Sequence, residues 1–89
     1  MKNALAITIT GRVQGVGFRF SAVNKAHQLG LKGFVKNTMD GTVYIEAEGE
    51  PEQLNEMVNW CWQGPSSARV DEVTKQEIPV RDYNRFGVQ

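Results

Sequence analysis

The sequence predicts an α+β domain in which two helices cover one face of a four-stranded antiparallel sheet. Three observations lead to this prediction. Strand-like and helix-like segments follow one another in the order strand, helix, strand, strand, helix, strand. Turn-forming residues, mostly glycine, separate these segments. The 89 residues are enough for one hydrophobic core, so we expect a single domain over residues 1–89.

The first strand and the loop after it differ in composition. Residues 5–10 alternate large apolar residues with smaller or polar ones, which is typical of a half-buried strand. Residues 11–17 contain three glycines in seven positions. Glycine adopts backbone angles that other residues resist, so this segment is expected to be a loop.

A first helix is expected from Arg19 or Phe20 to Leu29. Gly30 follows where a left-handed C-terminal cap belongs. His27 lies on the flank of the apolar face, where a lone histidine is expected to be a solvated surface residue. The apolar residues of this segment fall on one helical face: Ala22, Val23, Ala26 and Leu29.

A β-hairpin is expected next. Residues 31–38 form its first strand, Asp40–Gly41 supplies a strong turn signal, and the return strand begins near Val43. The return strand alternates apolar residues with Tyr44 and glutamates. We therefore expect the carboxylates of this region on the solvent-exposed face and end of the strand: Glu46, Glu48 and Glu50.

A second helix is expected to open at Pro51, a favoured first helical position, with Glu50 as its N-cap and Gly64–Pro65 at its end. One apolar stripe runs along it: Leu54, Met57, Val58 and Cys61. Cys61 is expected to be a buried, unreactive thiol. Trp60 and Trp62 are expected to pack at the borders of the stripe, with a partner-binding surface as the alternative.

The C-terminal part gives the weakest strand pattern. A fourth strand is expected within residues 70–78, with a bulge or bend near Asp71–Glu72. Val70 and Val73 differ in parity, one being at an even and the other at an odd position, so they would face opposite sides of a regular strand. Residues 85–88 are expected to add a short edge strand. The complete order is the split β-α-β, or ferredoxin-like, arrangement βαββαβ.

Charge is balanced overall but not along the chain. Ten lysines and arginines match ten aspartates and glutamates, yet residues 1–41 carry six cations and one carboxylate. The overall balance argues against nucleic acid as a partner, because binding to phosphate backbones needs a clustered positive surface. The basic first half still suits a small anion, although charged side chains that merely solvate two faces would give the same pattern.

The chain has one cysteine, no apolar run of about 20 residues and no signal-peptide core near its start. We therefore expect a cytoplasmic protein with no membrane partner, no internal disulfide and no multi-cysteine metal site. A monomer is expected, since no apolar stripe remains beyond the predicted core.

The glycine loop is the most informative feature for function. It joins a strand to a helix N-terminus, where unpaired N–H groups and the positive end of the helix dipole favour an anion. Glycines let consecutive N–H groups converge on a ligand, and Arg19 on the first helical turn would add a second contact to a phosphate. The loop matches neither the P-loop nor the dinucleotide pattern. A tight structural turn without a ligand is the alternative.

Two motifs resemble the signatures of the acylphosphatase family. The first is GRVQGVGFR at residues 11–19, and the second is GFVKN at residues 33–37 followed by DGTV at residues 40–43. The resemblance covers essentially the whole chain. It implies that the loop amides and Arg19 hold a phosphoryl group and that Asn37 orients the attacking water. The implied amide donors lie in the loop: Gln14, Gly15, Val16, Gly17 and Phe18.

The resemblance implies hydrolysis of a small-molecule acyl phosphate to a carboxylate and inorganic phosphate, which would also inhibit competitively. We expect no cofactor and no metal, because the motifs hold no second histidine or acidic pair and Arg19 and the loop supply the positive field. The chemistry fits the residues, because a carboxylate leaving group with a conjugate-acid pKa of about 4 departs at neutral pH without a general acid. No base appears in the motifs, so we expect a phosphate oxygen of the substrate to take the water proton.

Two other functions suit the same fold. A regulatory module could bind an anion without chemistry, and similar domains occur inside larger enzymes that handle carbamoyl phosphate. The chain starts at Met1 and ends soon after the last strand, which favours an independent enzyme. Single-stranded RNA binding would need exposed aromatic residues such as Phe34 and Tyr44, and the neutral charge opposes it.

Overall fold

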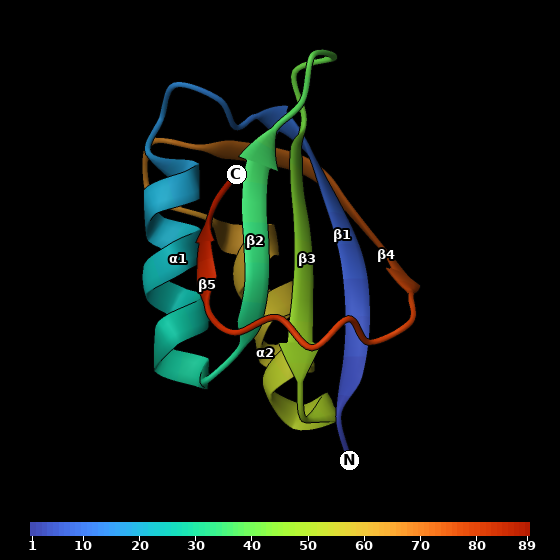
Figure 1. The fold of residues 1–89 in the computed structure, drawn as a ribbon. Helices are drawn as coiled ribbons and strands as arrows, with labels where there is room; N and C mark the ends of the chain where they lie inside the picture. Colours follow the sequence, from blue (N-terminus) through green and yellow to red (C-terminus); the bar gives the residue numbers. More distant parts are fainter.

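Two helices cover one face of a five-stranded sheet in the computed structural model, which describes residues 1–89 (Figure 1). The elements are β1 (Asn3–Arg12), α1 (Phe18–Leu29), β2 (Lys32–Asn37), β3 (Val43–Gly49), α2 (Pro51–Gln63), β4 (Arg69–Glu77) and β5 (Phe86–Val88). The strands lie in the order β4-β1-β3-β2-β5. The first four pair antiparallel, and β5 pairs with β2 in parallel. The predicted ferredoxin-like arrangement, with its short fifth strand, is confirmed. Neither helix is long and apolar enough to cross a membrane.

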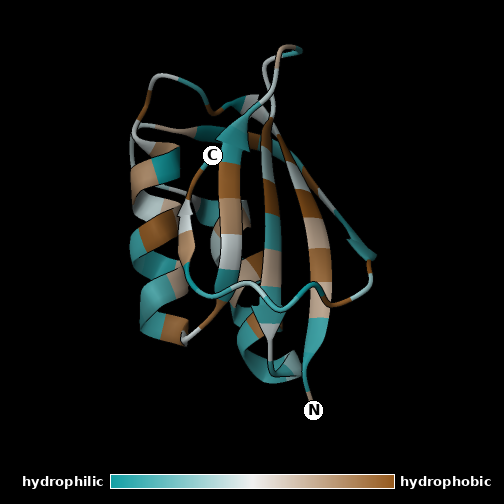
Figure 2. Cartoon of the chain, in the orientation of Figure 1, coloured by the Kyte–Doolittle hydropathy of each residue, from teal (hydrophilic) through white to brown (hydrophobic).

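The core lies between the sheet and the helices. The alternation of β1 buries Leu5, Ile7 and Ile9 against the helix layer, and β3 contributes Val43 and Ile45 to the same layer. Figure 2 shows the resulting apolar bands along the strands. The predicted stripe of α2 is confirmed, because all four of its members are buried: Leu54, Met57, Val58 and Cys61.

The bulge predicted in the fourth strand is present. Thr10 of β1 pairs with Glu72, whereas the next residue, Gly11, pairs with Val70, so Asp71 is the extra residue. This shift lets both Val70 and Val73 pack against the core despite their different parity. Gly11 has φ +134°, and a Cβ there would lie 2.2 Å from the carbonyl oxygen of Arg69. Only glycine fits where β1 leaves the sheet and enters the loop.

Both ends of α1 follow the predicted pattern. The helix begins at Phe18, one residue before the predicted range, and Gly17 is its N-cap in the left-handed conformation. Phe18 is buried and its ring lies 5.3 Å from that of Trp60 on α2, which fixes the start of the helix against the core. Gly30 caps the C-terminus as expected, with its N–H directed at the carbonyl oxygens of Ala26 and His27.

The prediction that Glu46 and Glu48 are solvent-exposed was wrong. After β4, residues 78–85 cross the open face of the sheet to reach β5 at the far edge (Figure 1). We call these residues the crossing segment. It covers β3, leaving Glu46 7% and Glu48 1% exposed. The segment has no periodic apolar pattern, so its position over this face could not be predicted from local sequence patterns. Glu50 is exposed, as expected.

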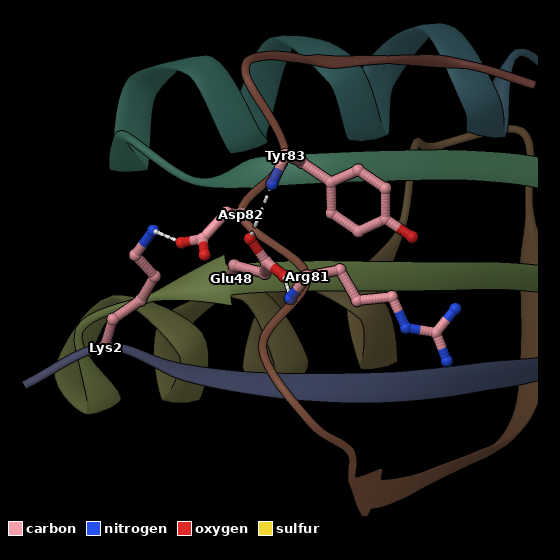
Figure 3. Close-up of polar contacts among 5 residues, drawn as sticks. All are labelled: Lys2, Glu48, Arg81, Asp82 and Tyr83. Atoms are coloured by element: carbon pink, nitrogen blue, oxygen red, sulfur yellow. Dashed lines mark hydrogen bonds and ion pairs between the residues drawn. The ribbon is translucent and has the colours of Figure 1, made fainter.

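The buried carboxylates hold the crossing segment in place. Glu48 accepts hydrogen bonds from the backbone N–H groups of Arg81 and of Tyr83, the latter at 3.0 Å. Figure 3 shows this carboxylate between the two residues, with the ion pair of Lys2 and Asp82 to one side at 2.9 Å. Backbone amides thus replace the water that the carboxylate loses on burial.

The phenols of the two tyrosines complete this cluster. Tyr44 and Tyr83 both donate to the Glu46 carboxylate, at 2.7 and 2.9 Å. Burial and the hydrogen bond to Glu46 raise the pKa of Tyr44 to about 12. The same two causes raise the pKa of Tyr83 above its usual value. Each of these groups is therefore held by a partner that favours its protonated form.

Candidate active site

The loop between β1 and α1, the end of β2 and the C-terminus lie at one end of the sheet (Figure 1). A cleft of about 420 Å³ opens there. Its polar lining consists of Gly15, Gly17, Arg19 and Asn37. The structure thus brings together the loop, the arginine and the asparagine, which come from separate elements and two separate motifs.

The loop presents free backbone donors. Residues 14–18 use none of their N–H groups in a hydrogen bond within the protein. Gly15 and Gly17 have φ +73° and +80°, and no atom lies within 4 Å of where their Cβ atoms would be. Left-handed residues within a turn point successive N–H groups toward one side, which forms an anion-binding nest. The open space beside both glycines lets a ligand approach the backbone closely.

Arg19 adds a positive charge to the same place. It is the second residue of α1, it is exposed, and no carboxylate lies within ion-pair distance of its guanidinium. The first turn of α1 contains no acidic residue either. A cation at a helix N-terminus opposes the helix dipole, so nothing in the chain compensates this end of the helix. The arrangement favours a bound anion.

Asn37 contributes to the cleft from the end of β2. It is the last residue of β2, where it pairs with Val43 of β3. Its Oδ1 atom is buried and has no hydrogen-bond partner in the chain. A buried acceptor left without a partner costs about 1–3 kcal/mol. Asn37 lines the cleft, and its Oδ1 retains an unused acceptor position.

The side chain of Gln14 has a role that the sequence did not reveal. Its Nε2 donates to the carbonyl oxygens of Thr38 and Thr42, at 2.8 and 2.9 Å. Gln14 therefore joins the loop to the hairpin that carries Asn37. The sequence motif names only the backbone amide of this residue, and a glutamine in a loop gives no signal of its long-range partner.

The hairpin turn next to Asn37 is held by its own hydrogen bonds. Asp40 accepts from the hydroxyl of Thr38 and from the backbone N–H and hydroxyl of Thr42, the latter two at 3.2 and 3.0 Å. These hydrogen bonds hold the pKa of Asp40 below its usual value, and the one from Thr38 contributes most. The turn that receives the Gln14 side chain is therefore ordered independently of it.

The remaining candidates lie outside the cleft or behind its wall. Val16 packs against the core, although its backbone N–H, like the others of residues 14–18, has no hydrogen-bond partner in the protein. Cys61 is buried, which raises the pKa of its thiol to about 12, and it has no place in the cleft. Trp62 is 50% exposed on α2. His27 is exposed, as expected, and its Nε2 lies 3.1 Å from the carbonyl oxygen of Phe86. No group of three or more His, Cys, Asp or Glu side chains is arranged to hold a metal ion.

Comparison with known proteins gives consistent matches over nearly the whole chain. The family model described as Acylphosphatase matches residues 5–88. An acylphosphatase of Marinobacter nauticus is 51% identical over 78 residues, which cover 88% of this chain and 85% of that protein. The structure of an acylphosphatase from Coxiella burnetii matches with a TM-score of 0.96 at 41% identity, covering 99% of this chain and 93% of that one. The acylphosphatase of Bacillus subtilis gives a TM-score of 0.95 at 34% identity, covering 100% of this chain and 99% of the other. The chain belongs to the acylphosphatase family.

Proposed function

We propose that this chain hydrolyses acyl phosphates to a carboxylate and inorganic phosphate, in the cleft between the loop and Asn37. One observation carries the proposal. Gly15, Gly17, Arg19 and Asn37 line the same cleft, and the backbone N–H groups of residues 14–18, the Arg19 guanidinium and the Asn37 Oδ1 have no partner in the chain. Membership of the acylphosphatase family supports the same reaction.

The loop and Arg19 bind the phosphoryl group in this proposal. Its oxygens accept hydrogen bonds from the amides of residues 14–18, at the N-terminus of α1, and from the guanidinium of Arg19. In the transition state of phosphoryl transfer, negative charge is spread over the three equatorial oxygens. Donors that are already fixed by the fold stabilise this charge without rearranging, which is the main source of the rate enhancement.

Asn37 positions the nucleophile. Its Oδ1 accepts a hydrogen bond from water, which places the water oxygen in line with the bond to be broken. The new bond forms between the water oxygen and phosphorus, while the bond from phosphorus to the acyl oxygen breaks and its electron pair leaves with the carboxylate. Arg19 is the only charged residue that lines the cleft. The water proton therefore passes to an oxygen of the phosphoryl group itself.

The reaction needs neither a general acid nor a metal ion in this scheme. A carboxylate with a conjugate-acid pKa of about 4 leaves unprotonated at neutral pH. Arg19 and the loop amides supply the positive field that a metal would otherwise supply. Inorganic phosphate, the product, competes with the substrate for the same donors. One chain builds the whole cleft, so a monomer is sufficient for activity.

The experiment that tests this function measures phosphate release from acetyl phosphate by the wild type and by Arg19→Ala. We expect turnover by the wild type that persists with EDTA, and a loss of about 100-fold or more in kcat/KM for the variant, in the range measured for removing one such donor. Lys25→Ala is the matched control, because it removes a cation from the same helix outside the cleft. Binding of acetyl phosphate without phosphate release would contradict the proposal and support a regulatory module.

A further inference from the structure

We propose that Phe20, Val23 and Val88 form an apolar wall that binds the acyl group, so that the enzyme prefers acyl phosphates with long or bulky apolar acyl groups. The inference rests on the proposed function, because it assigns the part of the cleft that the phosphoryl group leaves open. All three side chains line the same cleft as Arg19 and Asn37. We call these three residues the acyl wall.

The cleft has room for more than a phosphoryl group. Its volume is about 420 Å³. A phosphoryl group has four heavy atoms, equivalent to a few water molecules of about 30 Å³ each. The acyl group is joined to the phosphoryl group by a single oxygen, so it must lie in the remaining space or just outside it. The residues that border this space determine which acyl groups fit.

Two of the three residues of the acyl wall are unusually exposed for apolar residues, while Val23 is partly buried against the core. Phe20 is 72% and Val88 56% exposed, and both are among the few large apolar side chains at the surface. Exposed apolar groups that gather beside a polar site mark a ligand-binding surface, because covering them with an apolar ligand removes them from water. Phe20 and Val23 lie three positions apart on α1, so they share one face of the helix.

Val88 reaches this position through long-range contacts. It pairs with Val35 of β2, two residues before Asn37 on the same strand. The backbone N–H of Gln89 donates to the carbonyl oxygen of Val35 at 2.9 Å, which continues the pairing past Val88. Val88 therefore lies on the strand next to the one that carries the water-positioning residue. The crossing segment, anchored by Glu48, brings it there from the opposite edge of the sheet.

Charge in the cleft points to the same substrate class. Arg19 is its only charged lining residue, and the phosphoryl group occupies it. An acyl group that carries its own carboxylate or phosphate finds no second cation to pair with. It would also place its charge against Phe20, Val23 and Val88, where desolvation is costly. Apolar acyl groups gain from the wall, and anionic ones do not.

The test compares straight-chain substrates from acetyl to hexanoyl phosphate. Complete burial of a methylene would raise kcat/KM about fourfold. Because this open cleft buries each methylene only in part, we expect kcat/KM to rise about twofold for each added methylene. The ratio of hexanoyl to acetyl phosphate should therefore be about 10 or more in the wild type. Phe20→Ala and Val88→Ala should bring this ratio close to 1. Trp62→Ala is the matched control, because it removes an exposed aromatic side chain of α2 outside the cleft and should keep the wild-type ratio.

A binding measurement separates this inference from the proposed function. Calorimetric titration with methylphosphonate and hexylphosphonate should show the same preference for the longer chain and the same loss in Phe20→Ala. If the enzyme hydrolyses all acyl phosphates equally, the acyl wall is wrong and the proposed function stands. If no acyl phosphate is hydrolysed but hexylphosphonate binds more tightly through Phe20, the function is wrong and the wall stands. A preference that survives both wall substitutions would overturn the acyl wall.

Discussion

The side-chain amide of Gln14 donates a hydrogen bond of 2.8 Å to the carbonyl oxygen of Thr38, the residue directly after Asn37. This contact joins the loop that offers the amides to the strand end that offers the asparagine. The sheet also links the two halves, since Ile9 of β1 pairs with Val43, the partner of Asn37, but Gln14 adds a side-chain contact between the loop itself and the hairpin. If the proposed function holds, we expect Gln14 to set the distance between the phosphoryl group on the loop and the water on Asn37.

Replacing Gln14 should loosen the site without removing a group that touches the substrate. We expect Gln14→Ala to lower kcat by about 10-fold or more, because small displacements of reacting groups are costly, while phosphate inhibition changes less. Gln14→Glu should be at least as damaging, since a carboxylate cannot donate to the carbonyls of Thr38 and Thr42. Steady-state kinetics with acetyl phosphate provide the measurement. A Gln14→Ala enzyme with wild-type kcat would show that the link does not position the site.

Removing the Glu48 carboxylate should destabilise the protein, because the backbone N–H groups of Arg81 and Tyr83 would lose their acceptor. We expect Glu48→Ala to lower the free energy of unfolding by about 2–4 kcal/mol and Glu48→Gln, which keeps one acceptor oxygen, by about half as much. Urea unfolding measures both. The exposed Glu50 pairs with the N-terminal amine, and Glu50→Ala should cost no more than about 1 kcal/mol. Equal losses for the Glu48 and Glu50 variants would refute the role of Glu48 as an anchor.

The two tyrosines should titrate abnormally. Tyr44, with a pKa of about 12, and Tyr83, with its pKa raised, are the only tyrosines in the chain. A raised pKa stabilises the fold while the phenol is protonated, so this contribution is complete below pH 10 and is lost as the pH rises toward about 12. Ultraviolet titration of the folded protein should show no phenol ionising at the ordinary value. Glu46→Gln should lower both pKa values, and unchanged titration in that variant would count against the hydrogen bonds to Glu46.

Cys61 should be inert in the folded protein. Burial raises the pKa of its thiol to about 12, so almost no thiolate is present at neutral pH. A thiol-modifying reagent should therefore react only after unfolding in urea. Cys61→Ala should cost about 1–3 kcal/mol of stability by leaving a small cavity and should keep the wild-type kcat/KM. Rapid modification under native conditions, with loss of activity, would contradict this assignment.

Local patterns accounted for most of the fold and for its least regular strand. The parity of Val70 and Val73 was enough to predict a bulge or bend near Asp71–Glu72, because burial of both residues requires one extra residue between them, and the structure places that residue at Asp71. Positive-φ glycines marked the loop and the cap at Gly30, since each position needs a conformation that other residues resist.

The parts that could not be predicted depend on contacts distant in the sequence. Glu48 is buried by Arg81 and Tyr83, which lie 33 and 35 positions later in the chain, in a segment without a periodic apolar pattern. The alternation of β3 separates its two faces correctly but carries no information on what covers the second one. The link from Gln14 to the hairpin and the parallel pairing of β5 with β2 were missed for the same reason.

The central claim is that Arg19 holds the phosphoryl group while Asn37 places the water, and one paired measurement tests it most directly. It determines kcat for acetyl phosphate and the inhibition constant of inorganic phosphate in the wild type, Arg19→Ala and Asn37→Ala. We expect Arg19→Ala to weaken both turnover and phosphate inhibition, and Asn37→Ala to lower kcat by about 100-fold or more while phosphate inhibition stays within about twofold of the wild type. Phosphate inhibition unchanged in Arg19→Ala, or lost in Asn37→Ala with normal turnover, would contradict this division of roles.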